Sequence, residues 1–197
     1  MTNTIEQKKK PIIIIAIVHD DVTASARKTI YADYFYPFIT ELESFTGRKF
    51  HVIFGKGDPY SNFDYKGSDP LKTLQKWEFH CYRYINKLEE QGHTFDEIPL
   101  VVLLTNDSLN EKTLGAALVR QPSQIGTFAI ASLSSYATVG HEIGHLLGAK
   151  HEDSEVQYNG WWCETYMTPQ GDSMKSNCYT YSPANRENIK NFLNSKA

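Results

Sequence analysis

The stretch that decides both fold and chemistry is His141-Glu-Ile-Gly-His145-Leu-Leu-Gly148-Ala-Lys-His151. Residues four positions apart face the same side of a helix, so His141 and His145 can aim their imidazoles at one metal ion. Glu142 lies about 100° further round the helix, which suits a base that takes a proton from metal-bound water. Gly148 permits the left-handed backbone that ends a helix and returns the chain, so that His151 becomes the third ligand.

Three neutral imidazoles leave one position of a tetrahedral zinc ion open for water, which is the pattern of a catalytic site. A structural site would close with four protein ligands, usually including cysteine, and no cysteine lies within this spacing. The alternative is a helix whose histidines are ordinary surface residues. The sequence therefore predicts one catalytic Zn²⁺. The remaining histidines lack ligand spacing and are expected to be surface or core residues: His19, His51, His80 and His93.

Away from this motif, strand and helix signals alternate along the chain. This order predicts an α/β sandwich with a mostly parallel sheet. Pro37 falls inside the first predicted helix and should kink or interrupt it. The predicted strands are 11–18, 50–55, 99–105, 115–120 and 127–132, and the predicted helices outside the motif are 25–45, 71–91 and 183–194.

The beginning of the chain has two interpretations. Residues 1–10 are polar and basic, and the apolar run Pro11–Val18 follows, as in a signal peptide. The run is short, however, ends in His-Asp-Asp, and is followed by no small-residue cleavage site. Consecutive isoleucines favour a buried central strand instead.

Composition bounds the class of protein. The chain has 197 residues, which fits a single domain, 1–197, with an upper lobe over 1–147 and a lower lobe over 148–197. An apolar fraction of 41% indicates a globular chain, and a net charge of −3 gives no basic footprint for nucleic acid. No stretch is long enough to span a bilayer. We expect a monomer.

Three cysteines leave one unpaired. If a disulfide forms, Cys163 and Cys178 are the expected pair, because they lie close together near the C-terminus while Cys81 lies on a predicted helix. The alternative is three reduced, partly buried thiols. A calcium site is a further possibility for the loop over 56–69, although its acidic residues lack EF-hand spacing. These residues are Asp58, Asp64 and Asp69.

His-Glu-x-x-His-x-x-Gly-x-x-His is the signature of the metzincin clan of zinc endopeptidases, which this chain resembles. The clan's second mark is a methionine in a tight turn beneath the zinc. Met167 fits that mark, with Met174 as the competitor, because Pro169 follows Met167 as a turn signal. The alternative for either residue is an ordinary core methionine.

Within the clan, the chain looks most like the adamalysin/reprolysin branch. Gly-His-Leu-Leu-Gly-Ala-Lys-His, Met-x-Pro, and cysteines before the Met-turn and before the C-terminal helix carry this resemblance. Two departures matter. Glu152 follows the third histidine where reprolysins usually have Asp and astacins have Glu, and Pro169 stands where astacins carry a tyrosine ligand.

The resemblance implies an α/β catalytic domain with a mostly parallel, twisted five-stranded sheet. It also implies an antiparallel edge strand, a long active-site helix, and a small C-terminal lobe with a Met-turn and a terminal helix. Peptide substrate would lie along the edge strand over 114–121, and the chain over 168–174 would wall the pocket for the residue after the cut bond. The expected cleft residues are Leu114, Gly115, Ala116, Ala117, Leu118, Thr168 and Pro169.

The sequence therefore predicts a zinc-dependent endopeptidase in which Glu142 serves as the base. A zinc-containing protein that binds peptides without cutting them is the alternative, and the intact Glu142 argues against it. The sequence shows no prodomain or cysteine switch, so a delivered effector or toxin, restrained by an inhibitor or immunity partner, is a further hypothesis. We expect an extracellular or delivered protein without a recognisable signal peptide, with a cytoplasmic one as the alternative.

Overall fold

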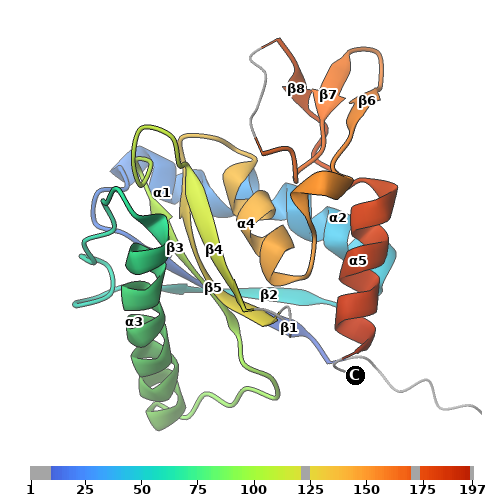
Figure 1. The fold of residues 1–197 in the computed structure, drawn as a ribbon. Coiled ribbons are helices and arrows are strands. Elements are labelled where there is room, and N and C mark those ends of the chain that lie inside the picture. Colours follow the sequence, from blue (N-terminus) through green and yellow to red (C-terminus); the bar gives the residue numbers. More distant parts are fainter. Residues whose placement is uncertain (1–9, 121–124, 170–173, 196–197) are drawn as a thin grey trace, which may run out of the picture.

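The computed structural model describes residues 10–120, 125–169 and 174–195. A five-stranded sheet forms its centre, and the prediction of a mostly parallel sheet with an antiparallel edge strand is confirmed (Figure 1). β1 pairs in parallel with β2 and β3, β3 pairs in parallel with β5, and β4 runs antiparallel to β5 at the edge. In spatial order the strands are β2 (Phe50–Gly55), β1 (Ile12–Val18), β3 (Leu100–Thr105), β5 (Ile125–Ser132) and β4 (Gly115–Arg120).

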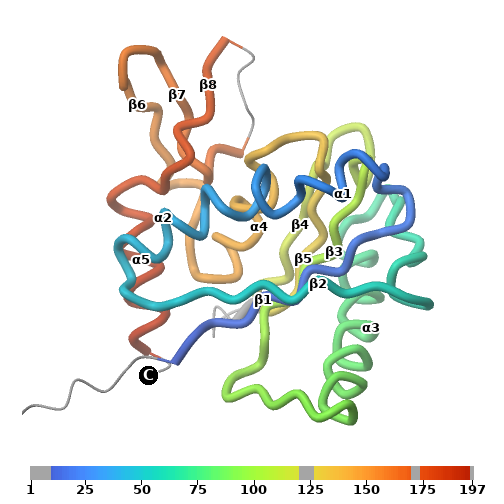
Figure 2. The backbone as a smooth tube through the Cα atoms, turned by 180° about the vertical axis from the view of Figure 1, so that it is seen from behind, coloured from blue at the N-terminus to red at the C-terminus, as the bar shows by residue number. Residues whose placement is uncertain are grey.

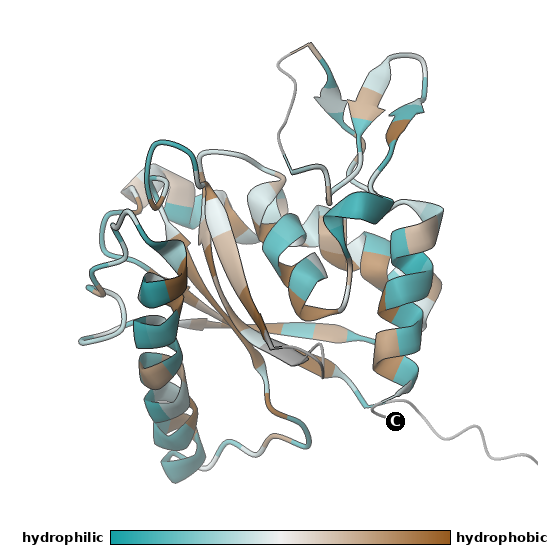
Figure 3. Cartoon of the chain, in the orientation of Figure 1, coloured by the Kyte–Doolittle hydropathy of each residue, from teal (hydrophilic) through white to brown (hydrophobic). Residues whose placement is uncertain are grey.

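Helices cover both faces of this sheet, as the two views show (Figures 1 and 2). Alternate residues of β1 face opposite sides: Ile14 joins one apolar core and Ile15 the other. The central strands β1 and β3 are therefore mostly apolar, whereas the outer faces of the helices are hydrophilic (Figure 3). One face carries α3 (Pro70–Glu90), and the other carries α1 (Ala24–Ile30), α2 (Tyr36–Thr46), α4 (Thr138–Leu146) and α5 (Pro183–Asn194).

The helix predicted over 25–45 is interrupted, as Pro37 indicated. A π-helical turn, η1 (Tyr31–Phe35), separates α1 from α2, and the Tyr36 N–H donates to the Tyr31 carbonyl oxygen. Proline in a regular helix would remove a hydrogen bond and clash with the carbonyl four residues before it. The wider π turn places Pro37 in the first turn of α2, where a missing N–H costs little.

The chain beyond α4 forms a second, three-stranded sheet that the sequence did not indicate. It consists of β6 (Val156–Tyr158), β7 (Trp162–Glu164) and β8 (Ser176–Asn177), and it projects from the rest of the molecule (Figure 1). A disulfide joins Cys163 to Cys178, and Cys81 is free and buried. Trp161 and Trp162, which lie next to this disulfide in the sequence, are 62% and 54% exposed.

The apolar run near the N-terminus is the central strand β1, with Ile14 and Ile15 fully buried. Among the described residues, no helix is both long and apolar enough to cross a bilayer. Residues 1–9, which belong to the basic stretch of the signal-peptide interpretation, lie outside the described residues. So do Gln121 of the expected edge strand and residues 170–173 of the expected pocket wall.

Candidate metal centre

One helix and the turn after it bring the three histidines together. α4 begins at Thr138 and carries His141 and His145. The chain then turns at Gly148, whose φ of +90° is one that residues with a side chain rarely adopt. His151 follows in a short 3₁₀ turn, η2 (His151–Asp153).

A buried asparagine on α5 fixes this return of the chain. Asn185 is fully buried, and its Oδ1 accepts a hydrogen bond from the Lys150 N–H at 2.7 Å. Its Nδ2 donates to the Lys150 carbonyl oxygen at 3.0 Å. Asn185 therefore binds both the N–H and the carbonyl oxygen of Lys150, the residue before His151. Sequence reasoning missed Asn185, because the contact spans 35 positions and no local signal marks it.

The imidazoles converge through their Nε2 atoms. His151 Nε2 lies 2.9 Å from both His141 Nε2 and His145 Nε2, which are 3.2 Å apart. His141 Nδ1 faces the Tyr166 carbonyl oxygen at 2.6 Å, and His145 Nδ1 faces the Ala149 carbonyl oxygen at 3.2 Å. Each carbonyl can only accept, so the proton of each ring belongs on Nδ1 and the Nε2 lone pair points to the common centre.

This donor set fits a zinc ion. Zinc with Zn–N bonds of about 2.05 Å in tetrahedral geometry separates its ligand nitrogens by roughly 3.3 Å, close to the spacing found here. Burial is the first cause that lowers the pKa of His141 to about 3 and of His145 to about 4, with neighbouring imidazoles adding to it. Both rings are neutral at pH 7, as metal ligands must be.

Glu142 lies beside the histidines, with 4% of its surface exposed. Burial raises the pKa of its carboxyl to about 8, and a cation held by the neighbouring imidazoles would lower it again. Gly115 of β4 leaves the space that the carboxylate occupies, because a Cβ built at Gly115 would lie 2.5 Å from Glu142 Oε1. The sequence identified Gly115 as a cleft residue and not as a neighbour of Glu142.

Met167 packs against the helix that carries the histidines. The Thr168 N–H donates to the Thr165 carbonyl oxygen at 3.1 Å, which closes a tight turn with Met167 inside it. Met167 is fully buried, and its Sδ would lie 2.6 Å from a Cβ built at Gly144. Met174, the competing residue, is 74% exposed.

A cavity of about 670 Å³ is lined by His141, Glu142 and His151. Four expected cleft residues line it: Leu114, Gly115, Thr168 and Pro169. The other three are not among its lining residues and are partly buried against the two apolar cores. Ala116 and Leu118 pack on the core under α3, and Ala117 packs on the core under α4.

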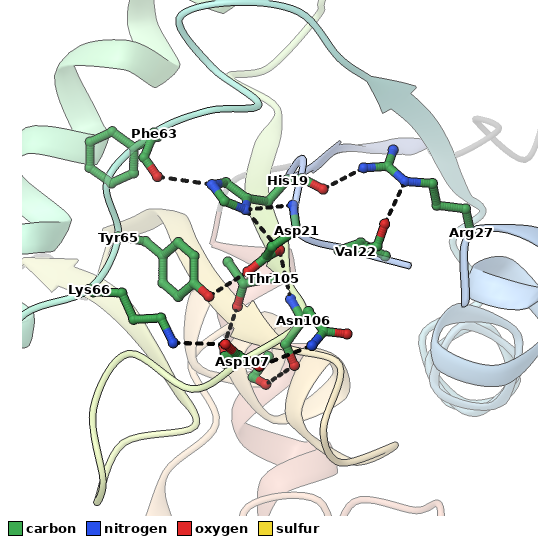
Figure 4. A network of polar contacts seen from close by, with 11 residues as sticks. His19, Asp21, Val22, Arg27, Phe63, Tyr65, Lys66, Thr105, Asn106 and Asp107 are labelled. Atoms are coloured by element: carbon green, nitrogen blue, oxygen red, sulfur yellow. Dashed lines mark hydrogen bonds and ion pairs between the residues drawn. The ribbon is translucent and has the colours of Figure 1, made fainter. Parts of the chain in front are cut away.

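A second polar cluster lies where β1 and β3 end (Figure 4). His19 Nδ1 lies 2.7 Å from Asp21 Oδ1, and His19 Nε2 lies 3.1 Å from the Phe63 carbonyl oxygen. The Tyr65 hydroxyl and the Asn106 N–H donate to the two oxygens of Asp21. These bonds tie the loop between β2 and α3 to the ends of β1 and β3. Each ring nitrogen of His19 already faces a protein oxygen.

Within the described ranges, the three histidines of the motif are the only group of three or more potential metal ligands that the structure brings together. Asp58, Asp64 and Asp69, the expected calcium candidates, form no such group. Asp69 instead caps α3, since its Oδ1 accepts a hydrogen bond from the Lys72 N–H.

In comparisons of sequence, no protein-family model and no curated protein matches this chain. In a comparison of structures, the fold is similar to the crystal structure of metalloproteinase-II from Bacteroides fragilis, with a TM-score of 0.63 and 18% sequence identity. The match covers 94% of this chain and 53% of that chain, so this chain spans about half of the other protein's length. At this identity the likeness shows a shared metalloproteinase-like fold.

Proposed function

We propose that the protein is a zinc-dependent endopeptidase. The observation that carries the proposal is the convergence of three imidazole nitrogens beside a buried carboxylate, at the base of one cavity. His141, His145 and His151 would hold the zinc. When bound, the ion supplies a Lewis acid that polarises a carbonyl and makes water nucleophilic at neutral pH. The structural likeness to a metalloproteinase supports the same conclusion.

The protein's own groups would perform the proton transfers. Glu142 faces the cavity and takes a proton from the attacking water, then delivers it to the leaving amine. β4 is the edge strand of the sheet, and Leu114 and Gly115 at its start line the cavity, so an extended peptide can be held there by strand addition. Thr168 and Pro169 form part of the opposite wall.

The test compares the wild type with Glu142→Ala and Glu142→Gln on a peptide library derived from a proteome. We expect cleavage by the wild type only, with rates of the variants lower by about 10²–10⁴-fold. A zinc chelator should stop the wild type, and added zinc should restore it. Equal cleavage by all three proteins would remove Glu142 from its role. Zinc binding without cleavage would favour the peptide-binding alternative.

Three finer aspects belong to the same proposal. The adamalysin/reprolysin branch remains our assignment within the metzincin clan, on the motif and the Met167 turn. The Cys163–Cys178 disulfide favours an oxidising compartment and therefore an extracellular setting. A delivered effector with a proteinaceous inhibitor fits that setting, and a test for toxicity inside a host cell, with and without Glu142, addresses it directly.

A further inference from the structure

The small sheet β6–β8 exposes large apolar side chains on one face. Directly opposite residues of an antiparallel pair share a face, so the register Tyr158↔Trp162 and Val156↔Glu164 places all four on the same side. The rings of Tyr158 and Trp162 meet edge to face at 5.2 Å between centroids. Even so, Tyr158 remains 65% exposed and Trp162 54% exposed. We call Val156, Tyr158 and Trp162 the aromatic face.

The aromatic face continues into the candidate active site. Glu164 shares that face with Trp162 and lies two residues further along β7, where it lines the cavity over the histidines. Asn177 of β8 is paired with Glu164 and also lines the cavity. The Cys163–Cys178 disulfide ties β7 to the residue that follows β8. A chain that leaves the cavity over β7 and β8 would therefore pass directly onto the aromatic face.

The size of this surface indicates what it can hold. With Tyr158, Trp162 and Val156 65%, 54% and 44% exposed, the face offers roughly 300 Å². A stable interface between two proteins needs about 800 Å² from each partner, so a second copy of the chain is poorly served by this area. It matches instead one or two bulky apolar side chains, for which tyrosine and tryptophan are common binding partners.

We propose that the aromatic face is a secondary substrate-binding surface, which receives a bulky apolar side chain of the same polypeptide that lies in the cavity. The identity of the occupant rests on the proposed peptidase function. The surface would select protein substrates with an apolar residue beyond the cavity, on the side that leaves over β7 and β8. Such a surface adds affinity without touching the bond that is cut.

Binding can be measured separately from cleavage in the zinc-loaded Glu142→Ala protein. Two fluorescein-labelled peptides share a central six-residue segment; one has serine–glycine flanks and the other tryptophan–leucine flanks. We expect the apolar-flanked peptide to bind about 10-fold more tightly, by fluorescence anisotropy. Adding Tyr158→Ser and Trp162→Ser together should remove that advantage, and Tyr158→Ser alone should reduce it. Both side chains are more than half exposed, so the fold should persist.

The matched control is Phe79→Ser on α3, which removes an aromatic ring that is 61% exposed away from the small sheet. It should leave the advantage of the apolar-flanked peptide intact. An advantage that survives loss of Tyr158 and Trp162 would overturn the inference. So would self-association, or binding to phosphatidylglycerol vesicles, that depends on those two rings. An advantage that follows the rings while the wild type cleaves nothing would support the surface and defeat the peptidase.

Discussion

The polar cluster around His19 and the group of three histidines differ in how far the protein itself supplies hydrogen-bond partners. Each ring nitrogen of His19 faces an oxygen of the protein, and Asp21 in turn accepts from Tyr65 and Asn106. His141 and His145 also turn one nitrogen each to a backbone oxygen, but their other nitrogens face only further imidazoles. We call the His19 cluster closed, because protein groups face both nitrogens of its imidazole. We call the group of His141, His145 and His151 open, because their Nε2 atoms converge on one point that a cation could occupy.

The difference separates a structural cluster from a binding site. A closed cluster gains nothing from a ligand, because each of the donors and acceptors described for it already has a partner. Three imidazole nitrogens that converge on one point, with the protons of His141 and His145 on the opposite ring nitrogens, gain most from a cation. Sequence spacing pointed to the open cluster. The closed one, built from strand ends 85 positions apart, had no motif.

The largest expected effect is the loss of metal from the open cluster. His145→Ala removes one of three ligands, and the zinc affinity should fall by on the order of 10³-fold, or about 4 kcal/mol. Competition with a fluorescent chelator measures it. His19→Ala is the control from the closed cluster and should keep its zinc. Equal losses in the two variants would erase the distinction between the clusters.

A second prediction concerns the packing beneath the open cluster. Alanine normally stabilises a helix relative to glycine by about 0.5–1 kcal/mol. At Gly144, however, a Cβ would lie 2.6 Å from Met167 Sδ and 2.8 Å from Tyr181 Cε1. Gly144→Ala should therefore destabilise the protein by about 2 kcal/mol, seen as a lower melting temperature. Gln75→Ala, at an exposed position of α3, should change stability by less than about 0.5 kcal/mol.

A smaller effect is expected in the closed cluster. Asp21→Asn removes the charge that the Tyr65 hydroxyl and His19 face, and it should lower the free energy of unfolding by about 1 kcal/mol at pH 7. Zinc affinity should stay at the wild-type value, since no contact links Asp21 to the histidines of α4 in the part of the chain described. Urea unfolding gives the first quantity and the chelator titration the second. A parallel fall in zinc affinity would show that the clusters are coupled.

The smallest expected effect is the pH dependence of the difference in unfolding free energy between the wild type and Asp21→Asn. Burial raises the pKa of Asp21, but hydrogen bonds from Tyr65 and Asn106, and His19 beside it, hold the net pKa below 3.8. A lowered folded pKa stabilises the protein above the unfolded pKa and loses this contribution as pH falls through the folded value. The gap in stability between wild type and Asp21→Asn should therefore shrink below about pH 4. A gap that widens on acidification would contradict this assignment.

The sequence predicted the central sandwich well and the small sheet not at all. Strand 50–55, strand 115–120 and helix 183–194 have the bounds found in the structure, because apolar runs and turn residues mark their ends. The strands of the small sheet have two or three residues each, too few for any periodicity. Trp162 of β7 is 54% exposed, against the ordinary tendency of tryptophan to be largely buried.

At the candidate metal centre, the spacing of the three histidines in the sequence was enough to predict that they lie together. The residues that hold the histidines in place could not be predicted from the sequence. Asn185 reaches the residue before His151 from another helix, and the Tyr166 carbonyl fixes the ring of His141. These contacts depend on tertiary structure, and an asparagine inside a helix carries no sign of its partner. Local patterns therefore identify the candidate ligands but not the residues that hold them in place.

Gly115 has a consequence for anyone who would rebuild this centre elsewhere. A donor scaffold is usually searched for places where histidines and a glutamate can be installed. Here the glutamate fits because the neighbouring strand carries only a hydrogen atom at one position. In a scan of all single substitutions, Gly115 should tolerate as few replacements as the three histidines, although it has no reactive side chain. The space that Gly115 leaves is therefore as necessary to this centre as the carboxylate of Glu142 that occupies it.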